Sequence, residues 1–299
     1  VPATASVGVH ERQGQKVRPT TIDIDGPSTY LEPHLYYFIE NEGRLSIDEA
    51  FKRLDMFKPI PDGSANFGLT TDVYWFAVGI RNLSDEPRHV LEIAYPLLDY
   101  LDVHLVTYDG EPIRSVQSMG DRLPFETRLR PHRTFTAELS YSPMGDAMLL
   151  VRVETQGSVR LPAKIYTEAS FGDHAATENA GIFFYYGIMF VMIVFNGFLF
   201  ITSREISYLA YITYLLMYLL AQMGMNGAIF QWLIPTNPDL VNDIQLASFI
   251  CMNIAVLWFS ETFFDNPIAR KTPIVRSWRF LRYVNSALLV VSFFVPYSI

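Results

Sequence analysis

The second part of this 299-residue chain contains very little charge. Residues 1–179 hold 17 of the 23 Lys and Arg residues and 26 of the 31 Asp and Glu residues, whereas residues 180–299 hold only 6 and 5. This division indicates an aqueous domain followed by a membrane domain. The net charge of −8 argues against nucleic-acid binding, which needs a basic surface. We therefore expect no nucleic-acid partner.

Cysteine is almost absent too. Cys251 is the only one, so no intrachain disulfide can form, and its apolar surroundings predict a packing role. The sequence has no GxSxG, GxxxxGKS/T or HExxH motif, and its six histidines lack zinc-binding spacing. We therefore expect no catalytic residue, no metal site and no resident cofactor in these residues.

Residues 30–170 carry the alternation of β-strands. Within residues 73–81, apolar side chains at alternate positions from Tyr74 share one face, which leaves Trp75 on the other face. Five further short runs follow, separated by Pro and Gly turns and not by helices. This pattern predicts an all-β sandwich of the jelly-roll kind.

The flanks of this domain are expected to be simple. Residues 1–29 are polar and predict an extended N-terminal segment, and residues 171–179 predict a short linker. Inside the domain, Ser46 and Glu49 form a capping box, which predicts a short helix that ends before Pro59.

Four apolar runs follow in the remaining residues, and each is long enough to cross a membrane, the last marginally. They span residues 180–201, 207–230, 244–263 and 280–296. Five amide side chains lie in these runs and are expected to bond between helices: Asn196, Gln222, Asn226, Gln245 and Asn253.

The loops between the runs predict the orientation. Residues 265–283 carry five Lys and Arg residues, whereas residues 231–243 carry none. The positive-inside rule places the loop at residues 265–283 in the cytoplasm, so the β domain lies outside. We expect a multi-pass membrane protein with an extracytoplasmic N-terminal domain.

The two ends of the sequence give further expectations. The start at Val1 fits removal of an export signal, although an arbitrary boundary would look the same. Four crossings would leave Ile299 outside the cell. We therefore expect that the chain continues into further helices.

Several motifs occur in order and resemble one family, the bacterial seven-transmembrane receptors with diverse intracellular signalling modules. They include Tyr74-Trp75-Phe76, Arg81-Asn82, residues 95–99 (YPLLD), residues 120–125 (GDRLPF) with Arg128, Arg152-Val153, Asn196-Gly197 and Asn226-Gly227. The resemblance covers about residues 30–299 and includes the second class of extracellular domain in that family. It implies a jelly roll similar to carbohydrate-binding modules and seven helices. We also expect a homodimer in the bacterial inner membrane, with the N-terminal domain in the periplasm. The resemblance also implies a cytoplasmic effector in the same chain, a diguanylate cyclase in the first place and a histidine kinase in the second.

Two groups of residues could hold a ligand. Asp121, Arg122, Arg128 and His132 lie in a loop-like stretch and could form charge-assisted hydrogen bonds with a polar molecule. The favoured alternative is a structural ion pair beside a turn.

The second group is aromatic. Trp75 and Tyr95 could stack on a carbohydrate, although packing is the favoured alternative. Arg81 and Arg152 join the candidates through the family motifs. A calcium ion held by Asp99, Asp102 and Asp109 is a further, weaker prediction.

The sequence as a whole predicts the signal-input part of a transmembrane receptor. Its β domain would bind a periplasmic small molecule such as a carbohydrate, and its helices in the lipid bilayer would pass the signal inward. Two alternatives stay open. One is a transporter or membrane enzyme with an accessory β domain, and the other is a receptor that binds only a protein partner.

Overall fold

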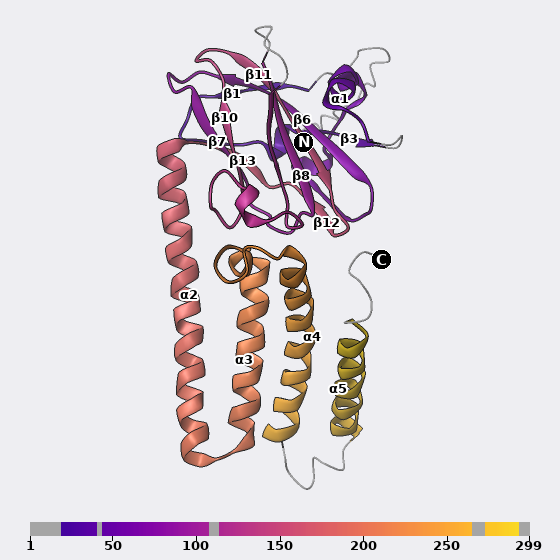
Figure 1. Ribbon diagram of the computed structural model, residues 1–299, viewed down its shortest axis with the longest axis vertical. Coiled ribbons are helices and arrows are strands. Elements are labelled where there is room, and N and C mark those ends of the chain that lie inside the picture. The colour runs from indigo at the N-terminus through magenta and orange to yellow at the C-terminus, as the bar shows by residue number, and fades with distance from the viewer. Residues whose placement is uncertain (1–18, 41–43, 108–113, 265–272, 293–299) are drawn as a thin grey trace, which may run out of the picture.

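The computed structural model describes residues 19–40, 44–107, 114–264 and 273–292. A β-sandwich forms one end of the molecule, and long helices extend away from it (Figure 1). The structure therefore confirms the expected order of a β domain followed by a helical part.

The larger sheet of the sandwich has seven strands. Their order is β4-β3-β6-β11-β8-β9, and β1 pairs in parallel with the end of β6. The strands are β1 (Thr21–Ile24), β3 (Tyr36–Glu40), β4 (Lys58–Pro59), β6 (Val73–Asn82), β8 (Tyr100–Thr107), β9 (Arg114–Met119) and β11 (Asp146–Glu154).

The smaller sheet has four strands in the order β10-β7-β13-β2, and a separate pair joins β12 to β5. Their bounds are β2 (Ser28–Tyr30), β5 (Asn66–Leu69), β7 (Arg88–Ile93), β10 (Phe135–Ser140), β12 (Ser158–Arg160) and β13 (Ala163–Thr167). Four short turns of 3-10 helix connect the strands: η1 (Glu32–His34), η2 (Leu54–Met56), η3 (Pro61–Gly63) and η4 (Phe125–Thr127).

The alternation along β6 divides its side chains between two apolar clusters. Tyr74, Phe76 and Val78 point into the main core between the sheets, whereas Trp75 belongs to a second cluster on the outer face. That outer cluster also contains Ala50 of α1 (Ile47–Lys52), whose expected capping box is present. Burial of each large apolar side chain contributes about 1.5–3 kcal/mol, so both faces of the large sheet stabilise the fold.

The structure adds detail at two expected segments. The segment 1–29 was expected to be extended, and its described residues 19–29 contain β1 and the start of β2. The segment 171–179, expected as a short linker, lies within α2 (Glu168–Ser203), a 36-residue helix that begins directly after β13. Its first turns pack on the small sheet through Phe171, which contacts Val90 and Tyr166.

Three helices are long and apolar enough to cross a membrane: α2, α3 (Ile206–Met225) and α4 (Pro238–Phe263). They extend away from the β domain, and the turn between α3 and α4, with η5 (Ile229–Leu233), lies beneath the sandwich (Figure 1). α5 (Pro273–Ser292) is not among the three. The expected run 280–296 ends outside the described residues, so a fourth crossing stays a prediction.

The amides in the helices bond both within and between helices. Asn196 and Asn253 each donate to the carbonyl one turn earlier in their own helix, and Gln222 donates to the nearby Tyr218 hydroxyl. Asn226, at the end of α3, donates to the hydroxyl of Tyr186 on α2 at 3.4 Å and so joins two helices.

Candidate functional site at the base of the β domain

The loop between β9 and β10 touches the helical part. It faces the segment that joins α3 to α4, residues 226–237, which we call the connector (Figure 1). The Phe125 N–H donates to the Pro235 carbonyl at 3.0 Å, and its ring meets the Phe230 ring edge-on. Gln231 donates to the Pro131 carbonyl at 3.1 Å. The candidate loop is therefore also the docking surface between the two parts.

The close approach depends on a glycine. Gly227 has a φ of +73°, and a Cβ atom there would lie 2.5 Å from the Arg133 carbonyl oxygen and 3.1 Å from Pro96. A larger residue would therefore be strained in this backbone conformation and would push the connector away from the loop.

Arg122 joins the β domain to α4. Its guanidinium contacts the carboxylate of Asp99 at 3.0 Å and that of Asp239, in the first turn of α4, at 3.0 Å. Asp99 also accepts hydrogen bonds from the Thr155 hydroxyl at 2.9 Å and the Gln156 N–H at 2.6 Å. Arg122 is thus held by Asp99 within the β domain and reaches across to α4.

Asp121 lies beside this pair. Its Oδ1 is buried and accepts no hydrogen bond among the described residues. Burial, and then the negative charge of Asp99, raise the pKa of Asp121 to about 7, although Arg122 and Arg128 oppose the shift. At neutral pH this carboxyl is therefore poised between its two protonation states.

Arg128 holds the loop together. Its Nη1 donates to two loop carbonyls at 2.9 and 3.0 Å, and burial lowers its pKa to about 10. The guanidinium lies 4.6–5.3 Å from three ring centroids, those of Phe125, Phe135 and Phe230. Since its contacts are within the protein, Arg128 supports the docking surface and is not open to a ligand.

His132 is another supporting side chain. It is buried, its Nδ1 lies 2.8 Å from the Thr134 hydroxyl, and its ring meets the Phe171 ring at the start of α2. Burial, and then the charge of Arg133, lower the pKa of His132 to about 4. The imidazole is therefore neutral at physiological pH.

A cleft of about 620 Å³ opens at this junction. Arg122, Asp99 and Asp239 line it, together with Thr71, Tyr100, Glu154, Thr155 and Gln156. Of the predicted ligand residues, only Arg122 lies in this wall. Asp239 was missed because it is 117 positions from Arg122 and belongs to the helical part. The one sequence feature that pointed to Asp239 was its place in residues 231–243, a segment that contains no Lys or Arg.

Two family models match the chain. The model for the 7TMR-DISM extracellular 2 domain matches residues 32–167, and the model for the 7TM diverse intracellular signalling region matches residues 178–299. No curated protein matches.

The chain belongs to the seven-transmembrane receptors with diverse intracellular signalling modules. The sandwich is the extracellular domain of this sensor-type receptor, and α2, α3 and α4 lie in its transmembrane region. The junction described above is therefore the contact between the sensor and the membrane region of the receptor.

The other predicted residues of the receptor lie away from the cleft. Tyr95 is half-buried beneath the guanidinium of Arg160. Arg81 lies at the other end of β6, in an exposed ion pair with Asp146 at 2.6 Å. The structure does not bring Arg81 together with the loop residues, whereas Tyr95 lies within electrostatic range of the loop carboxylate of Asp121.

Trp75 and Arg152 need a correction. Trp75 is only 1% exposed and donates to the Glu40 carboxylate at 2.7 Å, and the buried Arg152 contacts the same carboxylate at 3.2 Å. Both side chains lie on the outer face of the large sheet, in an ion-pair and packing network. They therefore do not form an open surface for a carbohydrate.

The calcium prediction involves two separate networks. Asp99 belongs to the junction, whereas Asp102 accepts from the Ser118 hydroxyl at 2.6 Å and lies 3.9 Å from Arg152. Asp109 lies outside the described residues. A calcium ion between these side chains stays a prediction.

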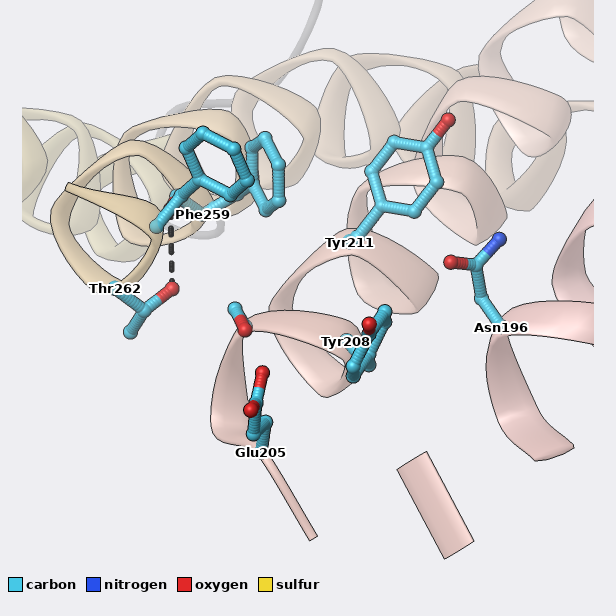
Figure 2. A pocket seen from close by; sticks show the side chains of 8 residues that line it. Asn196, Glu205, Tyr208, Tyr211, Phe259 and Thr262 are labelled. Carbon is cyan, nitrogen blue, oxygen red and sulfur yellow. Dashed lines mark hydrogen bonds between the residues drawn. The ribbon is translucent and has the colours of Figure 1, made fainter. Parts of the chain in front are cut away.

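A second cavity, of about 400 Å³, lies at the end of the helices remote from the sandwich. Figure 2 shows Asn196 on one side of it, Tyr208 and Tyr211 between, and Phe259 with Thr262 on the opposite side. Its walls come from α2, α3 and α4, so it lies inside the transmembrane region and is separate from the sensor junction.

Proposed function

We propose that this receptor detects a polar small molecule in the junction cleft, and that binding alters the docking of the β domain on the connector. One observation carries the proposal: Arg122 lines the cleft and also pairs with a carboxylate on each side of the junction. A ligand in the cleft would therefore act directly on this contact.

The two ion pairs of Arg122 differ in their surroundings. The Asp99 side chain is 8% exposed and makes two further hydrogen bonds, whereas the Asp239 side chain is 78% exposed. Exposed ion pairs contribute about 0–1 kcal/mol, so the contact with Asp239 is the weaker of the two. A ligand would break this contact first and leave Arg122 anchored on Asp99.

The lining suggests the chemistry of the ligand. Three carboxylates, those of Asp99, Glu154 and Asp239, line the cleft together with the Arg122 guanidinium, and Tyr100 is 43% exposed. Carboxylates accept from hydroxyl and ammonium groups, and an open aromatic ring can stack on a sugar or contact a cation. A carbohydrate or an amine fits this set.

The signal would then pass through the connector, because it joins α3 to α4. A ligand shifts a two-state equilibrium only as far as its affinity for the two states differs. We propose that the shift reaches a cytoplasmic effector in the same chain, a diguanylate cyclase first and a histidine kinase second, in a homodimer. The sensor would then lie in the periplasm, and the receptor would cross the bacterial inner membrane several times.

Calorimetry of the full chain in detergent against neutral sugars and amines tests the cleft. Glu154→Gln and Gln156→Ala should each weaken the binding of any ligand found by about tenfold or more, whereas Arg81→Gln should leave it unchanged. Binding that is indifferent to both cleft variants would place the ligand elsewhere. A response that needs a protein partner alone would favour the protein-receptor alternative.

A further inference from the structure

Three potential metal ligands meet between the small sheet and α2. Glu92 on β7, and His174 and Glu178 on α2, each offer one ligand atom, and these atoms all lie within 4.8 Å of one another. His174 and Glu178 are one helical turn apart, so their side chains lie on the same face of α2. None of the three lines the junction cleft.

The distances suit a single ion. His174 Nε2 lies 3.2 Å from Glu92 Oε2 and 3.7 Å from Glu178 Oε2. Two ligand atoms of a tetrahedral zinc site are roughly 3.4 Å apart, since each bond is about 2.0–2.2 Å long. An ion can therefore enter with small side-chain movements.

The burial of Glu92 is the second observation. Its side chain is 2% exposed, its other oxygen accepts from the Thr134 hydroxyl at 2.8 Å, and the Tyr166 side chain is also hydrogen-bonded to it. Among the described residues, the ion pair of Glu92 is with His174, which carries a charge only when it is protonated. A buried carboxylate needs a cation or a metal ion close by.

The neighbouring groups would support such a site. The Thr134 hydroxyl donates to the Glu92 carboxylate and is also hydrogen-bonded to His132. These contacts fix the orientation of the carboxylate. The Tyr166 ring stacks on the His174 imidazole with centroids 5.0 Å apart. Arg133 pairs with Glu178 and would compete with an ion for that carboxylate.

The geometry points to a binding site for a divalent transition-metal ion, of which zinc is the best example, at Glu92, His174 and Glu178. One imidazole and two carboxylates match the ligand preferences of zinc, and the remaining positions would hold water. A bound ion would fasten the first turns of α2 to β7. The ion would thus set how firmly the extracellular domain holds the first membrane helix.

Calorimetric titration of the EDTA-treated full chain with Zn²⁺, at constant pH and in detergent, tests this site. One Zn²⁺ should bind per chain with a Kd below about 100 μM, and Mg²⁺ should bind at least tenfold more weakly. His174→Gln and Glu92→Gln should each reduce the Zn²⁺ affinity by tenfold or more. His34→Gln, which changes an exposed histidine on η1, is the matched control and should have no effect.

Arg133→Gln supplies an independent readout, because it removes the competing cation. This variant should bind Zn²⁺ more tightly than the wild type, although loss of a buried guanidinium lowers its melting temperature. His174 is about one-third exposed, so His174→Gln is expected to fold even if Glu92→Gln does not. Absence of saturable Zn²⁺ binding up to 1 mM, or binding that His174→Gln does not weaken, would overturn the proposal.

Discussion

Two arginine–carboxylate pairs of the β domain differ chiefly in burial. The Arg152 side chain is 5% exposed and contacts Glu40, whereas Arg81 is half-exposed beside Asp146. Removal of one partner of a buried pair costs about 3–5 kcal/mol, because the other charge stays buried without compensation. An exposed pair contributes about 0–1 kcal/mol.

Arg152→Met should therefore lower the free energy of unfolding of the β domain by about 3 kcal/mol. Arg81→Met, the control, should lower it far less, because an exposed ion pair contributes little to stability. Denaturant titration of the full chain, followed by tryptophan fluorescence, measures both. Equal losses in the two variants would show that the outer network is not buried as described.

The pKa of Asp121 gives a prediction with a definite sign. Its value of about 7 in the folded protein exceeds the ordinary 3.8, so the folded state binds the proton more tightly than the unfolded chain. This stabilisation is present below about pH 4 and is lost as the pH rises through 7. His132 acts in the opposite direction over the same range, with a folded pKa of about 4 against an ordinary 6.5.

Asp121→Asn isolates the aspartate, because asparagine is neutral at every pH and His132 is present in both proteins. The stability of the wild type relative to this variant should fall by roughly 2–3 kcal/mol between pH 5 and pH 8. Denaturant titrations across this range measure the difference. A constant difference across the pH range would mean that Asp121 is ionised throughout.

Sequence reasoning found Asp121 and Arg122 of the junction but neither their roles nor Asp239. The dipeptide Asp121-Arg122 stood out because charged residues beside a Pro turn are easily recognised. Their partners Asp99 and Asp239 belong to distant segments, and single-sequence patterns carry no information about which distant segments meet. Burial decided the roles of Trp75 and His132, and it depends on the tertiary packing.

At the scale of the elements, the strands with clean alternation were predicted and the short or paired ones were not. β6 and β11 are buried on both faces and carry long apolar runs. β1 has only four residues and polar neighbours in the sequence, so it shows no alternating apolar pattern. It is held in the sheet by parallel pairing with β6. In α2, residues 171–179 contain the acidic Asp173 and Glu178 and precede the expected membrane boundary. The helix includes them because helical backbone hydrogen bonds satisfy their N–H and C=O groups.

The continuity of α2 can be measured directly. Amide hydrogens of residues 171–179 should exchange with solvent at least 100-fold more slowly than those of an unstructured chain, because they are bonded within a helix that packs on the small sheet. Hydrogen–deuterium exchange of the full chain with mass spectrometry gives the rates. Complete exchange within seconds would show that residues 171–179 form no stable helix.

At the scale of the whole molecule, the sensor and the membrane helices are joined in two places. One is the continuous helix α2, and the other is the docking of the β9–β10 loop on the connector. Two attachments restrict the sandwich more than a single tether could. A change at the junction would therefore move the connector against a fixed α2, and this relative movement is what we propose the receptor transmits.

The most direct test of this account is a double-mutant cycle on Arg122 and Asp239 in the full-length receptor. Its readout is the basal output of the cytoplasmic effector that we propose, measured as cyclic dinucleotide formed or phosphate incorporated, with Arg81→Gln as the control. Arg122→Gln and Asp239→Asn should each change the output by several-fold, and the double variant should change it no more than the stronger single variant does. Outputs equal to the wild type in all variants, or effects of the two substitutions that simply multiply, would contradict transmission through this junction.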